Sequence, residues 1–230
     1  MCNRYTLIDP DGAFAEIARI LGVPLHKPAW VVKRYNIAPT NVVPAVVNRG
    51  GGAEIMPLHF GFFAKGNPQM VPNARAETVY AKRSFKDAVP SHRCAIPTTG
   101  FIDWRDEDGH KWPYLFTRAD DRPFALAALW SSGDAARAVP PNFCIVTTEP
   151  NEVVAPVHNR MPVILREEHL ARWLDPAPMA EPEFQHIAEK LPAAALAARE
   201  VDDFINSVKH EGPECLGPPK PRGAQLGLGF

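Results

Sequence analysis

The chain has 230 residues, 46% of them hydrophobic, and its 25 Lys and Arg against 26 Asp and Glu give a formal net charge of −1. This length and apolar content suit one domain with its own core. The near-neutral balance excludes a uniformly basic nucleic-acid binder, so any DNA site has to be a local patch.

The N-terminal sequence and the positions of the cysteines exclude further classes of protein. The first residues contain no apolar core of a signal peptide, and no apolar stretch is long enough to span a bilayer, so we expect a cytoplasmic protein with no membrane partner. The four cysteines show neither a CxxC pair nor zinc-ligand spacing, which predicts no disulfide framework and no metal. Cys94 and Cys144 lie in apolar runs and are expected to be buried thiols, whereas Cys215 is placed in the tail and given no role.

The first predicted element is a helix over residues 11–22. Asp11 can cap it, its apolar residues recur at helical spacing, and Gly22 ends it. Most of the following elements are predicted strands, because β-branched and aromatic runs alternate with Gly-, Pro- and Asp-rich turns. In chain order we expect strands over 41–49 and 53–64, a helix over 77–89, and strands over 94–105, 112–118, 124–132 and 142–148.

Two helices complete the pattern, one over residues 167–174 and one that begins with Pro182 in its first turn and presents Phe184, Ile187, Ala188 and Leu191. The elements together predict an α+β domain with a mainly antiparallel, barrel-like β-sheet and a few peripheral helices. We expect this domain to cover residues 1–217 and a flexible C-terminal tail to cover 218–230. We expect a monomer, because no obvious apolar patch is visible in the sequence.

Cys2 is the first candidate for chemistry. If Met1 is removed, the chain begins with a cysteine whose α-amine has an ordinary pKa of about 7.7–8.0 and whose thiol is a strong nucleophile as thiolate. Such a 1,2-aminothiol condenses with an aldehyde to a five-membered thiazolidine, which a side-chain thiol or lysine alone cannot form. The alternative is that a cysteine at this position of a disordered start has no role.

Three internal segments carry further polar groups. Asn73, Arg75 and Glu77 place an amide, a guanidinium and a carboxylate together, either to hold an anion or carbonyl oxygen or simply to begin a helix. Asp103 shares one strand face with Phe101, where aromatic surroundings raise a carboxyl pKa, or it merely precedes a polar turn. His158 puts a titratable group two residues before Arg160, although a lone histidine is more often structural.

Taken together and in order, these segments resemble the SRAP family, the SOS-response-associated peptidase or abasic-site-processing proteins. The resemblance covers roughly residues 2–218 and rests on the segments Met1-Cys2-x-Arg4-Tyr5, Arg34-Tyr35-Asn36-Ile37-Ala38-Pro39-Thr40, Asn73-Ala74-Arg75-Ala76-Glu77-Thr78, Arg93-Cys94-Ala95-Ile96-Pro97, Gly100-Phe101-x-Asp103-Trp104 and His158-x-Arg160-Met161-Pro162.

The resemblance implies a DNA-damage response protein that binds single-stranded DNA at abasic sites, associates with the nucleoid when bound to DNA, and needs no cofactor. It implies covalent attachment to the lesion through Cys2 after removal of Met1, which the chain itself is expected to catalyse. Asn73 is expected to hold Cys2 and the sugar oxygen, Asp103 to shuttle protons, and His158 to assist ring opening. The resemblance also implies that flanking phosphates are bound by Arg4, Arg75 and Arg160.

Three departures from the family pattern bear on the site. Asn3 stands where Gly is usual, and Asp103 stands where Glu is usual. The run Phe60-Gly61-Phe62-Phe63-Ala64-Lys65-Gly66 replaces a Trp-Gly-Leu-x-Pro-x-Trp strand, which alters the aromatic platform.

Two other readings stay open. In an N-terminal-nucleophile amidohydrolase or peptidase without a DNA role, Cys2 attacks an amide and Asn73 lies in an oxyanion hole. In a non-catalytic binder of single-stranded DNA, Cys2 is incidental.

Overall fold

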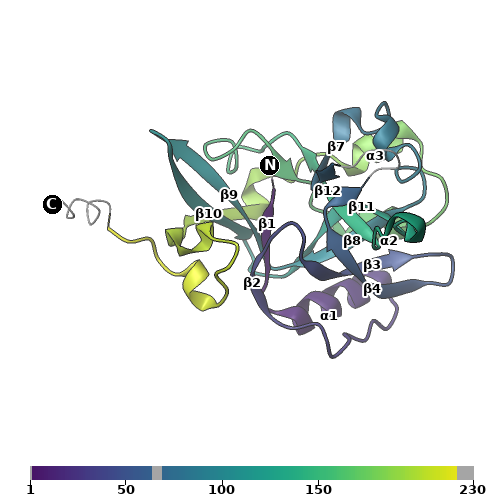
Figure 1. The fold of residues 1–230 in the computed structure, drawn as a ribbon, viewed down its shortest axis with the longest axis horizontal. Helices are drawn as coiled ribbons and strands as arrows, with labels where there is room; N and C mark the ends of the chain where they lie inside the picture. Colours follow the sequence, from purple (N-terminus) through teal and green to yellow (C-terminus); the bar gives the residue numbers. More distant parts are fainter. Residues whose placement is uncertain (1, 64–68, 222–230) are drawn as a thin grey trace.

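The fold is seen in a computed structural model that describes residues 2–63 and 69–221 (Figure 1). Its larger sheet is built on five strands: β3 (Val42–Asn48), β4 (Ala53–Phe60), β8 (Arg93–Thr98), β11 (Phe124–Ser131) and β12 (Asn142–Thr148). They run in the order β11-β8-β3-β4-β12, and β12 pairs again with β11, so the sheet closes into a ring. The ring pairs are antiparallel except for β12 with β4. The predicted α+β fold with a barrel-like sheet is therefore confirmed.

Two short strands extend the ring at β12. They are β7 (Asn73–Arg75), which runs parallel to β12, and β13 (Met161–Pro162), which runs antiparallel to it. A separate pair is formed by β5 (Phe62–Phe63) and β6 (Met70–Val71). Because β7 carries Asn73 and β13 follows directly after Arg160, β12 brings two predicted site segments to one place.

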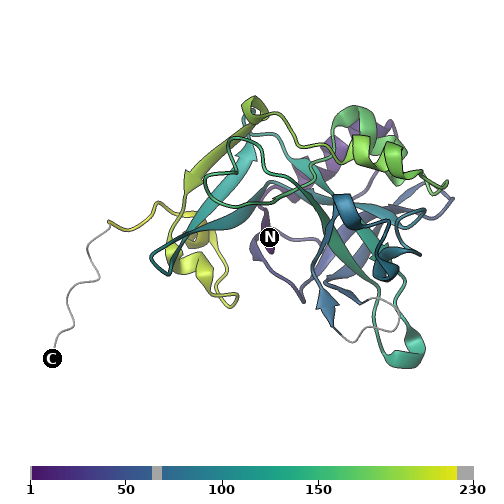
Figure 2. The same cartoon turned by 90° about the horizontal axis from the view of Figure 1, so that it is seen from above.

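The second sheet has the order β14-β10-β9-β1-β2. Its strands are β1 (Arg4–Leu7), β2 (Arg34–Ile37), β9 (Gly100–Glu107), β10 (His110–Arg118) and β14 (Leu196–Glu200). Figure 1 and Figure 2 show β1 starting between the β9–β10 hairpin and the ring. The start of the chain therefore lies in the interior, where the two sheets meet.

Aromatic rings fill the space between the sheets. The ring of Phe60 stacks on Phe143 with centroids 5.1 Å apart, and Tyr5 of the second sheet meets Phe60 edge-on at 5.9 Å. Phe101 and Phe116 stack at 4.8 Å on neighbouring strands. A strand that is buried on both faces has apolar side chains at consecutive positions. β11 is such a strand, and its sequence is therefore a continuous apolar run with no alternation of apolar and polar residues.

The predicted strand over 94–105 is wrong, because the structure divides it between the two sheets. β8 ends at Thr98 and β9 begins at Gly100, and the Thr98 hydroxyl donates to the carbonyl of Thr6 at 2.8 Å. A Cβ atom at Gly100 would lie 2.8 Å from the carbonyl oxygen of Phe116. Glycine therefore permits the close approach at this corner.

The predicted helix over 77–89 is also wrong. The segment contains only the 3₁₀ turns Ala76–Thr78 and Arg83–Phe85. Val79 and Phe85 are both buried, as are Ala88 and Val89. In one continuous α-helix Val79 would point away from the other three, so breaking the helix lets both groups reach the core.

The remaining differences are at element ends. The predicted strand over 53–64 stops at Phe60, since Gly61 adopts a φ of 129°, and residue 64 lies outside the described residues. Helix α1 (Pro10–Leu21) begins one residue before the predicted cap Asp11, and its actual cap is Asp9, whose side chain accepts from the backbone N–H of Gly12. Gly22 ends this helix in the left-handed conformation, as predicted.

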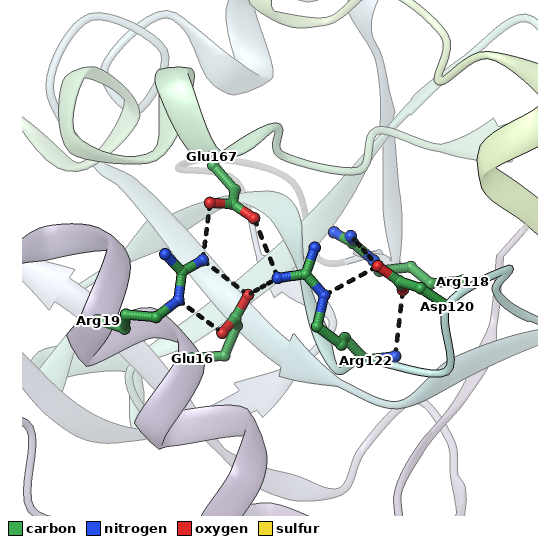
Figure 3. A network of polar contacts seen from close by, with 6 residues as sticks. All are labelled: Glu16, Arg19, Arg118, Asp120, Arg122 and Glu167. Atoms are coloured by element: carbon green, nitrogen blue, oxygen red, sulfur yellow. Dashed lines mark hydrogen bonds and ion pairs between the residues drawn. The ribbon is translucent and has the colours of Figure 1, made fainter.

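The C-terminal helices match the sequence pattern closely. α2 (Glu167–Leu174) has the predicted bounds, and α3 (Glu181–Ile187) contains Pro182 in its first turn but ends before Leu191. Figure 3 shows a polar network that connects α1, α2 and the β10–β11 turn through Glu16, Arg19, Arg118, Asp120, Arg122 and Glu167.

The chain after β14 packs on the outer face of the second sheet. Ile102 and Leu115 of the sheet form a second apolar cluster with Val201, Ile205 and Cys215. The placement of Cys215 in the tail is therefore wrong, because it lies buried in the 3₁₀ turn Pro213–Leu216. Of the predicted tail, residues 218–221 are exposed and 222–230 lie outside the described residues. No helix of the described chain is long and apolar enough to cross a membrane.

Candidate functional site

Cys2 precedes β1 by two residues, and the pairing of β1 places it beside β9. Arg4 lies opposite Ile102 in this antiparallel pair, so the chain before Arg4 runs past Asp103 and Trp104. Cys2 is fully buried, and its thiol lies 3.9 Å from the carbonyl oxygen of Arg4. Burial raises the pKa of this thiol well above its ordinary value, and the nearby Asp103 carboxyl raises it further.

Asp103 is the carboxyl group beside this cysteine, and it is almost fully buried at 3% exposure. Its Oδ1 accepts from the backbone N–H of Trp104 at 3.1 Å. Burial raises the pKa of Asp103, and the neighbouring His158 opposes this rise. A carboxyl group with a raised pKa keeps its proton to a higher pH than an ordinary aspartate, which suits it to act as a general acid and base.

His158 comes from the turn before β13 and faces Asp103. Its Nδ1 lies 3.7 Å from Oδ2 of Asp103 and 3.0 Å from the backbone N–H of Arg160. In the other tautomer Nδ1 can donate to the carbonyl oxygen of Arg160, 3.3 Å away, but the shorter contact with the N–H favours a neutral ring with its hydrogen on Nε2. Nε2 is then the atom that can give a proton to a reacting group.

Asn73 is buried at 7% exposure at the start of β7. Its Nδ2 donates to Oδ1 of Asn3 at 2.6 Å, so the residue directly after Cys2 is tied to β7. The Oδ1 of Asn73 is buried and has no hydrogen-bond donor among the described residues. The structure thus brings the start of the chain and the Asn73 segment together, as the sequence motifs predict.

Arg160 forms a bidentate ion pair with Glu77, with Nη1 to Oε1 at 2.8 Å and Nη2 to Oε2 at 2.9 Å. Its Nη2 also donates to the carbonyl of Thr147 at 2.7 Å. Burial opposes ionisation of Glu77, but the Arg160 hydrogen bonds and charge outweigh it and lower the pKa of Glu77. The pair fixes the guanidinium against the outer end of β12.

The two other predicted arginines lie in different surroundings. Arg75, at the end of β7, is exposed. Arg4 is buried at 8% exposure, and burial lowers its pKa. Its Nη1 donates to Oδ1 of Asn36 at 2.7 Å and to the carbonyl of Ile205 at 2.9 Å. Arg4 therefore connects β1 to the C-terminal segment.

Two residues that hydrogen-bond to the candidate site or to Arg4's neighbours, Asn3 and Asn36, are not predicted as site residues from the sequence. Asn36 donates to the carbonyls of Ile205, Ser207 and His210, so it holds the same C-terminal segment as Arg4. Asn3 departs from the family pattern in the sequence, and its side chain is the hydrogen-bond partner of Asn73. Neither has a local sequence signal, because each acts on residues far away in the chain.

A separate cavity of about 790 Å³ lies between β5 and the loop after β11. Phe62, Phe63, Arg83, His92, Trp130 and Arg137 are among its lining residues. None of Cys2, Asn73, Asp103 or His158 lines it, so the convergence of these polar groups, rather than cavity size, defines the candidate site. Among the described residues, no group of three or more His, Cys, Asp or Glu is arranged to hold a metal ion.

This architecture places the chain among α+β proteins that hold a near-terminal cysteine between a closed antiparallel sheet and a second sheet. The chain belongs to the SOS response associated peptidase (SRAP) family, whose family model matches residues 1–208.

Named relatives cover most of the chain. It is 32% identical to the abasic site processing protein YoaM of Bacillus subtilis over 225 residues, which are 94% of this chain and 97% of the relative. It is 29% identical to the abasic site processing protein YedK of Escherichia coli, over 81% of this chain and 85% of the relative. The corresponding protein HMCES of Gallus gallus is 26% identical, over 84% of this chain and 70% of the relative.

Solved structures show the same fold. A crystal structure of a protein from Bacteroides thetaiotaomicron superposes with a TM-score of 0.78 at 21% identity and covers 94% of this chain and 99% of that chain. A protein from Bordetella bronchiseptica superposes with a TM-score of 0.72 at 22% identity, over 87% of this chain and all of that chain.

Proposed function

We propose that this chain processes abasic sites in single-stranded DNA and forms a covalent thiazolidine crosslink to the lesion through Cys2 after Met1 is removed. The observation that carries the proposal is the placement of Cys2 beside a buried carboxyl group with a raised pKa, Asp103, which in turn faces His158. The names of the relatives YoaM, YedK and HMCES support the choice of substrate.

The chemistry begins at the sugar. An abasic deoxyribose is mostly a closed hemiacetal, and it opens when the C1′–O4′ bond breaks and a proton passes from the C1′ hydroxyl to O4′. His158 is the group we assign to this transfer, through the Nε2 hydrogen of its neutral ring. The product is a C1′ aldehyde with a hydroxyl group at C4′.

The α-amine of Cys2 then adds to the aldehyde carbon and forms a carbinolamine. Asp103, in its protonated form, gives its proton to the departing hydroxyl, so that water leaves and an iminium ion remains. The thiol of Cys2 adds to the same carbon and returns its proton to Asp103, which closes the thiazolidine. The raised pKa of the thiol disfavours thiolate, and this supports attack by the amine first and by sulfur second.

The DNA backbone requires positive charge near this centre. Arg75 is exposed at the end of β7, and Arg160 lies at the end of β12, so both are proposed ligands for phosphates that flank the lesion. Arg4 already donates to protein acceptors, and its contact with phosphate stays a prediction. We propose that the chain acts as a monomer in the cytoplasm, on the nucleoid when bound to DNA.

We also propose that the chain removes its own Met1, by hydrolysis of the Met1–Cys2 peptide bond with Cys2 as the nucleophile. Mass spectrometry of the purified N-terminus tests this step. The unchanged protein is expected to begin at Cys2 and the variant Cys2→Ala to keep Met1. If the alanine variant loses Met1 equally, another enzyme removes it and the self-cleavage proposal is wrong.

The crosslink is tested with protein of confirmed N-terminus and a single-stranded oligonucleotide that carries one abasic site. On a denaturing gel we expect a slow species that needs both the lesion and Cys2. Cys2→Ala is the matched variant, and an oligonucleotide with an intact base is the matched DNA. Binding without an adduct would favour a non-catalytic DNA binder, and release of small amides without DNA binding would favour an amidohydrolase.

A further inference from the structure

The carboxamide of Asn3 is bonded to the carboxamide of Asn73. Nδ2 of Asn73 donates to Oδ1 of Asn3 at 2.6 Å, while Oδ1 of Asn73 is buried without a donor among the described residues. An acceptor that is removed from water and given no donor costs free energy, so native proteins rarely keep one without a purpose. The Nδ2 atom of Asn73 is therefore hydrogen-bonded, whereas its Oδ1 atom has no donor among the described residues.

The direction in which this carboxamide lies decides what it can do. An asparagine side chain turned by half a turn exchanges its acceptor and its donor, and the two orientations have the same shape. In the orientation that the structure shows, Oδ1 of Asn3 is the acceptor and holds Nδ2 of Asn73 on its own side. It leaves Oδ1 of Asn73 as the end that can accept a hydrogen bond from a group entering the site.

We propose that Asn3 is a positioning residue, which orients Asn73 so that its Oδ1 accepts a hydrogen bond from a donor of the reacting centre. This inference rests on the proposed function. Two donors have the required chemistry: the α-ammonium group of Cys2 after Met1 is removed, and the C4′ hydroxyl that the sugar gains only when its ring opens. In the closed sugar O4′ carries no hydrogen, so this contact would favour the open form.

The placement of Asn3 agrees with this role. Asn3 is the direct neighbour of Cys2, and Asn73 lies opposite Ile145 of β12, so the bond connects the reacting end of the chain to the rigid ring. A glycine at residue 3, the residue usual in the family, has no side chain to make this bond. Orientation of Asn73 by a neighbouring carboxamide is thus possible in this chain and impossible with glycine at residue 3.

Asn3→Ala and Asn3→Asp test the proposal, since alanine removes the acceptor and aspartate keeps it. The rate of adduct formation is measured at saturating DNA as a function of pH, and rates are compared on the plateau of each profile because the charge of the introduced carboxylate shifts the amine titration. If the donor is the sugar hydroxyl, we expect Asn3→Ala to be slower by about tenfold on the plateau, the effect of one net hydrogen bond, and Asn3→Asp to stay within about twofold of the unchanged protein. Affinity for DNA with a tetrahydrofuran lesion analogue, which cannot react, is expected to stay unchanged.

The profile of Asn3→Ala also distinguishes the two donors. If Oδ1 accepts from the α-ammonium group, it stabilises the charged amine, so its loss moves the rise in rate to lower pH. If it accepts from the sugar hydroxyl, the rate falls equally at every pH. In Asn73→Ala, the further change Asn3→Ala is expected to have no effect on the rate.

Equal plateau rates together with an unshifted pH profile for Asn3→Ala would overturn the inference, and so would an Asn3→Asp variant as slow as Asn3→Ala on the plateau. The unchanged protein is assayed first: if it forms no adduct at all, the proposed function is wrong and the positioning role falls with it.

Discussion

Nδ1 of His158 lies 3.7 Å from Oδ2 of Asp103 and at the same time accepts from the backbone N–H of Arg160. A neutral His158 can therefore keep its Arg160 hydrogen bond only with its hydrogen on Nε2, away from that bond. When the ring gains a second proton, Asp103 is the carboxylate at hand to balance the charge. A second proton goes to Nδ1, which can then no longer accept from Arg160, so protonation of His158 replaces that hydrogen bond with an ion pair to Asp103.

The first prediction concerns the variant Asp103→Asn. It removes the proton carrier while keeping the shape, so adduct formation is expected to slow by about 10²- to 10⁴-fold, the usual contribution of a general acid–base group. Asp103→Glu, measured by the same gel assay, restores the carboxyl group common in the family and is expected to keep far more activity. An Asp103→Asn variant as fast as the unchanged protein would exclude Asp103 from proton transfer.

The same substitution has a second, opposite effect on stability. Because the pKa of Asp103 is raised in the folded protein, the folded state binds this proton more tightly than the unfolded state. Ionised Asp103 therefore destabilises the fold at neutral pH, and this penalty disappears as the pH falls through the folded pKa. Asp103→Asn is expected to raise the melting temperature at pH 7 and to lose that advantage toward pH 3, as seen by thermal unfolding at both pH values.

The second prediction concerns the phosphate ligands. Arg75→Gln and Arg160→Gln are each expected to weaken binding to single-stranded DNA regardless of sequence and to reduce the slope of log K against log salt by about one phosphate. Fluorescence anisotropy at several salt concentrations measures the slope. Arg137→Gln is a matched control, because Arg137 is exposed beside the separate cavity and not beside Cys2. If the slope of log K against log salt in both variants equals that of the unchanged protein, these arginines do not contact phosphate.

Much of the fold could be predicted from the sequence because local signals matched the final structure. β12 and α2 have their expected bounds, since each is an apolar run with clear turn residues on both sides. The division of residues 94–105 could not be predicted, because the apolar pattern continues through Thr98 and only the contact of Gly100 with Phe116 shows the corner. β1 and β2 are only four residues long, which is too short for a periodic signal.

In the candidate site too, features that depend on local sequence could be predicted and contacts between residues distant in the chain could not. Ordered motifs identified Cys2, Asn73, Asp103 and His158, and the structure provides the geometry that connects them. The motifs do not predict that Arg4 is buried or that Asn3 is hydrogen-bonded to Asn73. Burial and long-range hydrogen bonds depend on which strands pack together in the fold. Sequence patterns therefore identify candidate reacting groups, while their long-range hydrogen-bond partners are visible only in the fold.

The third prediction follows from the burial of Arg4. Arg4→Met removes hydrogen bonds to Asn36 and to the carbonyl of Ile205. The Ile205 carbonyl keeps Nδ2 of Asn36 as a donor, but Oδ1 of Asn36 is left buried without one, so we expect a loss of about 1–3 kcal/mol in the free energy of unfolding. Hydrogen exchange should increase over residues 201–216, which Arg4 holds against the sheet. Arg75→Met, at an exposed position, is the control and should change stability little. Equal stability of the two variants would contradict the connecting role of Arg4.

The fourth prediction concerns the network of Figure 3. Glu16, whose side chain is only 14% exposed, contacts both Arg19 and Arg122, and these hydrogen bonds and charges lower its pKa. A lowered folded pKa means that the stabilisation is present above the unfolded value of about 4.3 and is lost as the pH falls through the folded pKa. Glu16→Gln should therefore cost about 1 kcal/mol or less at pH 7, because its partners are about half exposed.

The test is chemical unfolding of Glu16→Gln and the unchanged protein at pH 7 and pH 3. We expect the difference between the two proteins to shrink at the lower pH, because a protonated Glu16 no longer attracts its arginines. High salt at pH 7 should shrink it as well, since the arginine partners are solvent-accessible. Glu54→Gln is the matched control: Glu54 pairs only with Arg49 within one hairpin of the described chain, so it is expected to change stability less. A difference that stays constant from pH 7 to pH 3 would mean that Glu16 stabilises the α1–α2 contact by packing rather than by charge.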